Sequence, residues 1–412
     1  MQVVFAKSVQ GESHKRREQE IENLKNNRTF PCQDKSLAGE FTSGDGIKFT
    51  FLCACDGHGG ASYFRSDKGA DFAIQVLQDI LIRNMKRINE LAVNGEFKKI
   101  KEQLSLAITK RWKEKVVNDI SENPITELEY QYLSEEKPET VEKYKQGIGV
   151  TSIYGCTMIA YFATESYWYA LQIGDGDLAI SYDGKTFEMP MPEDAECFLN
   201  QTTSLCDDNA VNEFRWISNT TIPQFVFCST DGIANSFKDN TTLISNFYLP
   251  VSQLFNEEDQ YEKCHQCKNN ICDIKCRFEL CKVEIENYLP LLSKKGSGDD
   301  ITLVLAVQID DAKIQSILNY LRGTKLYKNG QKYKGITLLK QASLLGNNKA
   351  LERLGDKCVD AIIKVNESQR KKFVLRALRY YTDAYENSKD PSILLKIDNL
   401  KRDYQTELLE NV

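Results

Sequence analysis

The chain has 412 residues, of which 41% are hydrophobic and 27% are charged, and its net charge is −6. This length exceeds one ordinary hydrophobic core, so two domains of a globular protein are expected. The acidic balance argues against a dedicated nucleic-acid binder. No stretch approaches the ~20 apolar residues of a membrane span, and the N-terminus becomes charged too early for a secretory signal. We therefore expect a cytoplasmic protein that binds neither nucleic acid nor membrane.

The cysteines and histidines bear on whether the chain forms disulfides or a zinc site. Several of the 13 cysteines lie inside apolar runs, which is typical of reduced thiols packed as small hydrophobic side chains. Only three histidines occur, His14, His58 and His265, so a catalytic zinc site built on several imidazoles is nearly excluded.

The first three quarters of the chain alternate strand and helix patterns. Five apolar runs rich in β-branched and aromatic residues predict strands covered on both faces. They are Lys48–Cys55, Cys156–Ala163, Tyr167–Ile173, Gln224–Cys228 and Ile301–Ile309. Apolar residues recur every three or four positions in Ala70–Leu91 and Phe97–Val117, which predicts two helices. The polar segment Ser121–Gly147 contains Pro124 and Pro138 and predicts a loop or an irregular insertion.

The pattern changes after Asp310–Asp311, where the strand signal disappears and amphipathic helical stretches follow. We expect one domain over residues 1–310 and a helical domain over residues 311–412. Small and aromatic residues between Tyr327 and Gly355 have the spacing of paired-helix repeats, and Ala377–Ala384 is similar. Tetratricopeptide-like packing and a plain helical bundle are equally compatible with this pattern.

Aspartates at the ends of apolar runs carry the chemical signal. Asp45–Gly46 and Asp183–Gly184 lie between polar residues and predict hairpin turns. Asp56, Asp175 and Asp231 instead follow buried-type runs, and Gly298–Asp299–Asp300 opens another. Carboxylates gathered at core-strand ends would repel one another, and a hard divalent cation is the simplest compensation. Ligation by oxygen alone favours Mg²⁺ or Mn²⁺.

Several short motifs occur in the order shown by one enzyme family. They are DGHGG (Asp56–Gly60), GCT (Gly155–Thr157), IGDGD (Ile173–Asp177), STDG (Ser229–Gly232) and GSGDD (Gly296–Asp300). In this order the chain resembles the metal-dependent type 2C serine/threonine protein phosphatases. Ser8–Asp34 and the phrase NQTTSL (Asn200–Leu205) resemble the bacterial branch, and the resemblance covers roughly residues 1–309.

The resemblance implies an α+β fold, in which two antiparallel sheets are sandwiched between helices, followed here by the all-α C-terminal domain. It implies hydrolysis of phosphoserine and phosphothreonine in phosphorylated proteins, by attack of a hydroxide bridging two Mn²⁺ or Mg²⁺ ions, with a third weak ion in some members. Two such ions lie about 3.5–4 Å apart and clamp the phosphoryl oxygens for in-line attack. The helical tail is expected to offer a surface for a protein partner.

The family's site residues map onto this sequence position by position. Asp56 resembles the aspartate that bridges the metals, and the Gly57 carbonyl resembles a further ligand. Asp231 and Asp299 match direct carboxylate ligands, Asp34 matches a residue holding metal-bound water, and Asp175 matches a ligand of the third ion. His58 matches the proposed general acid for the leaving alkoxide, whose departure needs a proton.

Three positions depart from the family pattern. Thr29 stands where the family usually carries a phosphate-binding arginine, and Arg28 or His14 is the candidate substitute. Gln33 stands where glutamate is frequent, and Asn235 replaces an aspartate, which weakens the third metal site. A catalytically weak pseudophosphatase, which binds phosphoproteins as a scaffold, is therefore the alternative function.

Residues 264–281 hold five cysteines and His265. A zinc or iron–sulfur site is one interpretation, but the spacing lacks the paired Cys-x2-Cys units of common zinc modules. Thiols lining the helix expected before the last strand are the favoured interpretation.

Overall fold

The structure is a computed structural model that describes residues 2–14, 31–192, 202–256, 274–405 and 408. Its internal contacts divide the chain into two compact units. The first holds Gln2–Asn256 and Cys281–Gln308, and the second consists mainly of Ile309–Val412. No helix in the described ranges is both long and apolar enough to cross a lipid bilayer.

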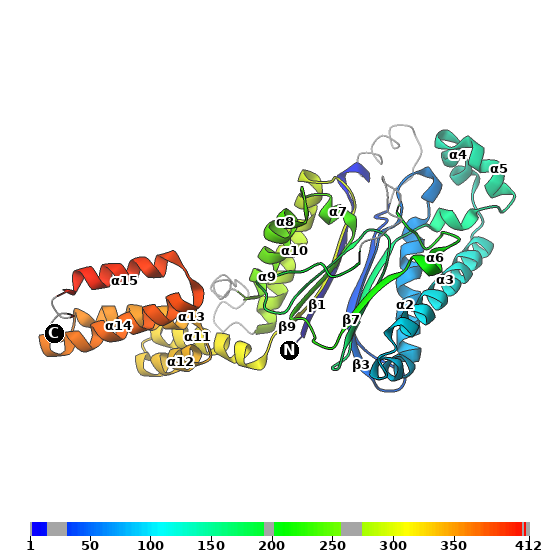
Figure 1. Cartoon of the computed structure of the whole chain (residues 1–412). Helices are drawn as coiled ribbons and strands as arrows, with labels where there is room; N and C mark the ends of the chain where they lie inside the picture. The colour runs from blue at the N-terminus through cyan, green and yellow to red at the C-terminus, as the bar shows by residue number, and fades with distance from the viewer. Residues whose placement is uncertain (1, 15–30, 193–201, 257–273, 406–407, 409–412) are drawn as a thin grey trace. The chain divides into compact units, whose positions relative to one another are not determined.

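The first unit is a sandwich of two antiparallel sheets, as predicted (Figure 1). One sheet has the strand order β1-β9-β8-β6, formed by β1 (Gln2–Val9), β9 (Ile301–Gln308), β8 (Phe225–Ser229) and β6 (Asp177–Ser181). The other has the order β2-β3-β4-β5-β7, formed by β2 (Lys35–Thr42), β3 (Lys48–Cys55), β4 (Met158–Ala163), β5 (Trp168–Ile173) and β7 (Arg215–Asn219).

Alternating residues of each strand divide the core into two layers. Leu52 and Ala54 of β3 belong to a cluster that also includes Val226 of β8 and Val304 of β9, so this layer lies between the sheets. The intervening residues, such as Cys53, pack in a second cluster with the helices. Strands β3, β4, β5, β8 and β9 therefore bury both faces, which explains why their sequences are continuously apolar.

Helices α2 (Ser66–Val93) and α3 (Phe97–Glu122) cover the outer face of the five-stranded sheet. They confirm the two predicted helices. The segment predicted as a loop or irregular insertion instead holds helices α4 (Glu127–Glu136) and α5 (Pro138–Lys145). A capping box between Thr126 and Glu129 starts α4, and Pro138 occupies the first turn of α5. These local starts stabilise helices whose residues are too polar to show an apolar period.

Shorter elements complete the first unit: η1 (Ala61–Tyr63), η2 (Val150–Tyr154), α6 (Ala210–Glu213), α7 (Asp231–Ala234), α8 (Asn240–Leu243), η3 (Ile244–Tyr248) and α9 (Leu249–Asn256). Helix α10 (Ile274–Lys295) precedes β9 and includes the described end of the cysteine-rich segment. Cys281 is buried there, whereas residues 264–273 lie outside the described ranges, so the role of this cysteine cluster stays untested.

The second unit is all-helical, as predicted. Its helices are α11 (Asp311–Lys328), α12 (Lys332–Leu344), α13 (Asn348–Ile362), α14 (Glu367–Ser388) and α15 (Pro391–Asp403). Helix α11 packs on α12 and α13 packs on α14. A Cβ atom on Gly323 would lie 2.9 Å from the Gly335 carbonyl oxygen, so glycine permits this close helix approach. The tetratricopeptide identity of these pairs stays a prediction.

Candidate functional site

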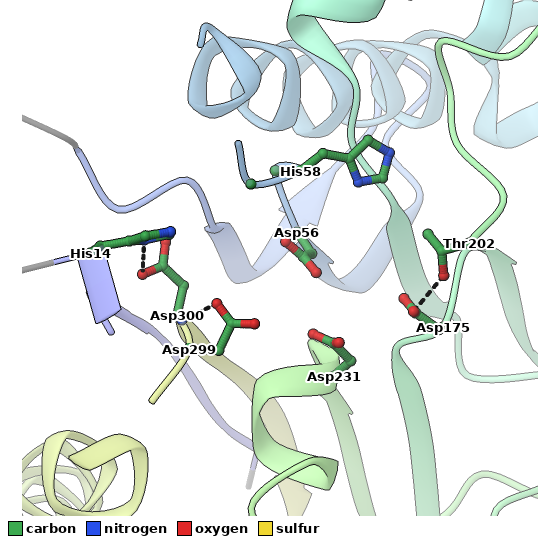
Figure 2. Close-up of a pocket in the computed structure, with 10 residues that line it drawn as sticks. His14, Asp56, His58, Asp175, Thr202, Asp231, Asp299 and Asp300 are labelled. Carbon is green, nitrogen blue, oxygen red and sulfur yellow. Dashed lines mark hydrogen bonds and ion pairs between the residues drawn. The ribbon is translucent and has the colours of Figure 1, made fainter. Parts of the chain in front are cut away.

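A cleft of about 200 Å³ opens where strands of both sheets end (Figure 2). Strand β3 runs directly into Asp56, β8 is followed closely by Asp231, and Asp299 and Asp300 immediately precede β9. Asp175 lies in the turn between β5 and β6. The fold thus brings these aspartates from four distant segments to one cleft. Its lining is His14, Asp56, Gly57, His58, Gly59, Asp175, Thr202, Asp231, Asp299 and Asp300.

The backbone beside Asp56 is tightly packed. Gly57 forms an isolated β-bridge with Cys156, and the Thr157 amide donates to the Asp56 carbonyl at 2.8 Å. A Cβ atom on Gly57 would lie 2.6 Å from the Gln33 carbonyl oxygen, which leaves no room for a side chain. Glycine therefore allows the chain to pass here while it carries Asp56 into the cleft.

Three carboxylates converge closely enough to share a cation. Asp56, Asp175 and Asp231 each offer an oxygen, and these oxygens lie within 4.8 Å of one another. The Asn235 amide donates to Asp231 at 2.8 Å, and the Thr202 hydroxyl donates to Asp175. Figure 2 shows Asp299 on the same cleft, on the side toward His14. Asp299 accepts a hydrogen bond from the Asp300 amide at 2.8 Å.

These carboxyl groups destabilise one another's charged form. Burial, together with the charges of Asp34 and Asp231, raises the pKa of Asp56 well above its usual value. Burial and the charges of Asp175 and Asp299 raise the pKa of Asp231 to about 6. Burial and neighbouring carboxylates also raise the pKa of Asp299. Asp56, Asp231 and Asp299 thus resist ionisation, and a divalent cation would supply the positive charge that stabilises their charged form.

Asp34 is not among the residues that line the cleft. Its side chain is 1% exposed, and one oxygen accepts a hydrogen bond from the Thr230 hydroxyl at 2.7 Å. The other oxygen, Oδ1, is buried with no hydrogen-bond partner in the described structure. Burial and the charge of Asp300 raise the pKa of Asp34 to about 8. An orphaned buried oxygen is costly, and a water or cation ligand would satisfy it.

His58 is held between the DGHGG loop and the neighbouring η2 segment. Its amide donates to the Gly155 carbonyl at 3.0 Å, and its ring packs edge-on against Tyr63 with centroids 5.0 Å apart. A Cβ atom on Gly155 would lie 2.7 Å from the His58 ring, so glycine leaves space for the imidazole. Burial lowers the pKa of His58 despite the nearby charges of Asp175 and Asp207.

The cleft includes most of the residues that the motifs singled out. Of the predicted set, His14, Asp56, Gly57, His58, Asp175, Asp231 and Asp299 line it. Arg28 and Thr29 lie outside the described residues. Sequence reasoning assigned no role to Asp300 or Thr202, although both belong to quoted motifs. Their position next to motif aspartates was the available signal.

Comparison with known families now gives a match. The profile of one family, Protein phosphatase 2C, matches residues 25–267. A search among curated proteins finds no match.

Three solved structures with a similar fold are distant from this chain in sequence. The S. agalactiae serine/threonine phosphatase is 12% identical over 75% of this chain and 100% of that chain, with a TM-score of 0.42. The Mycobacterium tuberculosis serine/threonine phosphatase PstP/Ppp is 12% identical over 75% and 99%, with a TM-score of 0.40. The catalytic domain of PstP in complex with 2 manganese ions is 13% identical over 75% and 99%, with a TM-score of 0.40.

Proposed function

Because the chain belongs to the protein phosphatase 2C family, we propose that it is an active, metal-dependent phosphoprotein phosphatase. Its substrates are proteins carrying phosphoserine or phosphothreonine. The observation that carries this proposal is the convergence of Asp56, Asp175 and Asp231 beside a buried imidazole in one cleft. A binding scaffold without activity would have no need for buried carboxylates that destabilise one another.

The donor set fits Mn²⁺ or Mg²⁺, which prefer oxygen ligands. Asp56, Asp231, Asp299 and the Gly57 carbonyl would hold two ions, Asp175 would serve a third, weaker one, and Asp34 would hold metal-bound water. The orphaned Asp34 oxygen and the raised carboxyl pKa values support this assignment. When bound, the metals activate water for in-line attack and neutralise the phosphoryl oxygens.

The chain's own residues bind the substrate and manage protons. His58 donates a proton to the leaving serine or threonine oxygen, because an alkoxide departs poorly without one. The His58 ring packs against Tyr63 and lies close to Gly155. His14 and Arg28 are the candidates for holding the substrate phosphate.

The helical unit is proposed to bind a protein partner and to contribute nothing to the chemistry. We place the boundary between the catalytic domain and the helical domain at residues 310 and 311, and the protein in the cytoplasm. All residues lining the cleft precede this boundary.

The direct test measures phosphate release from a phosphothreonine peptide with and without Mn²⁺. Turnover that requires Mn²⁺ and disappears in chelator is the expected result. Peptide binding without release of phosphate, in the presence of Mn²⁺ or Mg²⁺, would identify a pseudophosphatase scaffold and overturn the proposal.

A further inference from the structure

The cleft contains two imidazoles in opposite environments. Burial lowers the pKa of His58, whereas the hydrogen bond to Asp300 raises the pKa of His14 against the opposing effect of burial. His14 Nδ1 and Asp300 Oδ1 are 2.8 Å apart. An ionised carboxylate can only accept, so Nδ1 carries the proton in this bond. Figure 2 shows the His14 ring above Asp300, with its second nitrogen turned toward the cleft.

Asp300 is a rigid anchor for this imidazole. Its two oxygens accept hydrogen bonds from the backbone amides of Gly11 at 2.7 Å and Gln33 at 2.6 Å. With the His14 ring, three donors thus surround the two Asp300 oxygens, and such hydrogen bonds favour the charged form of a carboxylate. Asp300 therefore keeps its negative charge in a cleft where neighbouring carboxyl groups are pushed toward the neutral form.

The turn that carries His14 is itself fixed to the same segment. The Ser13 amide and hydroxyl both donate to the Gly298 carbonyl, at 2.9 and 2.8 Å. A Cβ atom on Gly11 would lie 2.3 Å from the Asp299 carbonyl carbon, so only glycine permits this approach. The His14 side chain is 15% exposed. It is thus accessible from the cleft yet held at a defined place in it.

A phosphate group entering this cleft needs hydrogen-bond donors. Five aspartates line the cleft, and its described lining includes no lysine or arginine. His14 and His58 are the only lining side chains with a ring nitrogen, and Thr202 donates to Asp175. Only His14 has a buried carboxylate beside it that stabilises the doubly protonated ring. That ring presents Nε2–H to a phosphate oxygen as a charge-assisted donor.

We propose that the His14–Asp300 pair is the substrate-phosphate anchor of this chain, with Asp300 as the positioning residue. His14 donates from Nε2 to a non-bridging phosphate oxygen, and Asp300 holds Nδ1–H. An arginine would bind the phosphate through two N–H donors, whereas this pair binds it through one. His14 therefore binds the phosphate, while His58 donates a proton to the leaving oxygen. This inference rests on the proposed phosphatase function and assigns a residue to its phosphate subsite.

The experiment compares His14→Gln and Asp300→Asn with wild type, and Asp183→Asn, in an exposed turn outside the cleft lining, serves as the control. Each protein is assayed with Mn²⁺ on p-nitrophenyl phosphate and on a phosphothreonine peptide, and inorganic phosphate is the competing probe. Loss of one charge-assisted hydrogen bond should raise KM and the inhibition constant of phosphate about 10- to 100-fold in His14→Gln. Asp300→Asn should change both constants in the same direction, and Asp183→Asn should change neither. Circular dichroism establishes that each variant is folded.

We expect KM to rise equally for both substrates, because a phosphate anchor binds the phosphate group of every phosphate ester. A loss confined to the phosphothreonine peptide would make His14 a proton donor and overturn the proposal. Unchanged phosphate inhibition in His14→Gln would overturn it as well.

The phosphate subsite is separable from the proposed function. If wild type releases no phosphate, calorimetric titration of inorganic phosphate into the Mn²⁺-loaded protein measures the subsite directly. Weaker phosphate binding in His14→Gln would then support the His14–Asp300 pair as the phosphate anchor, even though the catalytic proposal fails. Unchanged phosphate binding in this variant would overturn the proposal that the pair is the anchor.

Discussion

The turn at Asp183–Gly184 and the cleft at Asp231–Gly232 contain the same dipeptide in opposite electrostatic environments. Asp183 is exposed, and its carboxylate accepts hydrogen bonds from the amides of Lys185 and Thr186, both at 2.8 Å. These bonds lower the pKa of Asp183 to about 2. Asp231 is half-buried beside other carboxylates, and its burial together with the charges of Asp175 and Asp299 raises its pKa to about 6.

The difference shows what an Asp–Gly dipeptide means in this fold. The lowered pKa of Asp183 means that its ionisation stabilises the folded state above pH ~4, and this is lost as the pH falls toward 2. The raised pKa of Asp231 means that ionisation destabilises the metal-free fold as the pH rises from about 4 through 6. Asp183 therefore contributes to stability, while Asp231 costs stability unless a cation compensates it.

Replacing the aspartate by asparagine at each of these two positions should give the largest difference in activity. Asp231→Asn removes a carboxylate from the metal cluster, and metal ions contribute several kcal/mol to catalysis. We expect activity with Mn²⁺ to fall by about 10³-fold or more. Asp183→Asn keeps the acceptor oxygen in the turn, so its turnover should stay near wild type.

Initial rates on a phosphothreonine peptide across a Mn²⁺ titration measure both variants. An Asp231→Asn protein with normal turnover and normal Mn²⁺ dependence would show that this carboxylate binds no catalytic metal. Loss of activity in Asp183→Asn would instead mean that the turn and the cleft do not differ in function.

His58 extends the comparison to two substrates that differ in their leaving groups. His58→Ala should slow hydrolysis of the phosphothreonine peptide by about 10²–10⁴-fold, because an alkoxide needs a proton from a general acid. On p-nitrophenyl phosphate the loss should be small, since nitrophenolate departs without protonation. Steady-state kinetics on both substrates give the ratio, and equal losses would mean that His58 only maintains the shape of the site.

The sequence was most informative where strands are buried on both faces. Strands β4, β5 and β8 are wholly buried, and their continuous apolar runs predicted them. Strands β2 and β7 have no fully buried residue, so nothing in their sequences separated them from loops. Helix α4 was missed because its residues are too polar to show an apolar period, and a tertiary contact adds to its local start: Glu129 forms a bidentate ion pair with the buried Arg65, with both N–O distances at 2.8 Å.

The sequence predicted those site residues that belong to recognisable motifs. Asp56, Asp175 and Asp231 could be chosen because each follows an apolar run, and the fold brings them together. The role of Asp300 was not visible, because it depends on amides of Gly11 and Gln33 that lie far away in the sequence. Tertiary structure alone supplies such donors.

The stability of the metal-free protein should fall as the pH rises, because the carboxyl groups with raised pKa values become charged. A shift from 3.8 to about 6 at Asp231 corresponds to at most about 3 kcal/mol of lost stability once ionisation is complete. In chelator, the unfolding free energy of wild type should fall between pH 4 and 7, and Asp231→Asn should flatten this decline. Mn²⁺ at 100 times its Kd should restore about 2.7 kcal/mol to wild type. Urea unfolding at each pH measures these changes, and a wild-type profile that rises over this range would contradict the clustering of charge.

The smallest effect is expected when the helical unit is removed altogether. Every residue that lines the cleft lies at or before Asp300, and the last strand, β9, ends at Gln308. A chain shortened to residues 1–310 keeps β9 paired with both β1 and β8. It should therefore fold and hydrolyse p-nitrophenyl phosphate at a near-native rate. A chain shortened to residues 1–295 is the matched control, because it loses β9 and leaves two strands without their partner, so it should not fold. Inactivity or aggregation of the 1–310 chain would mean that the helices complete the catalytic core, and that the boundary at residue 310 is misplaced.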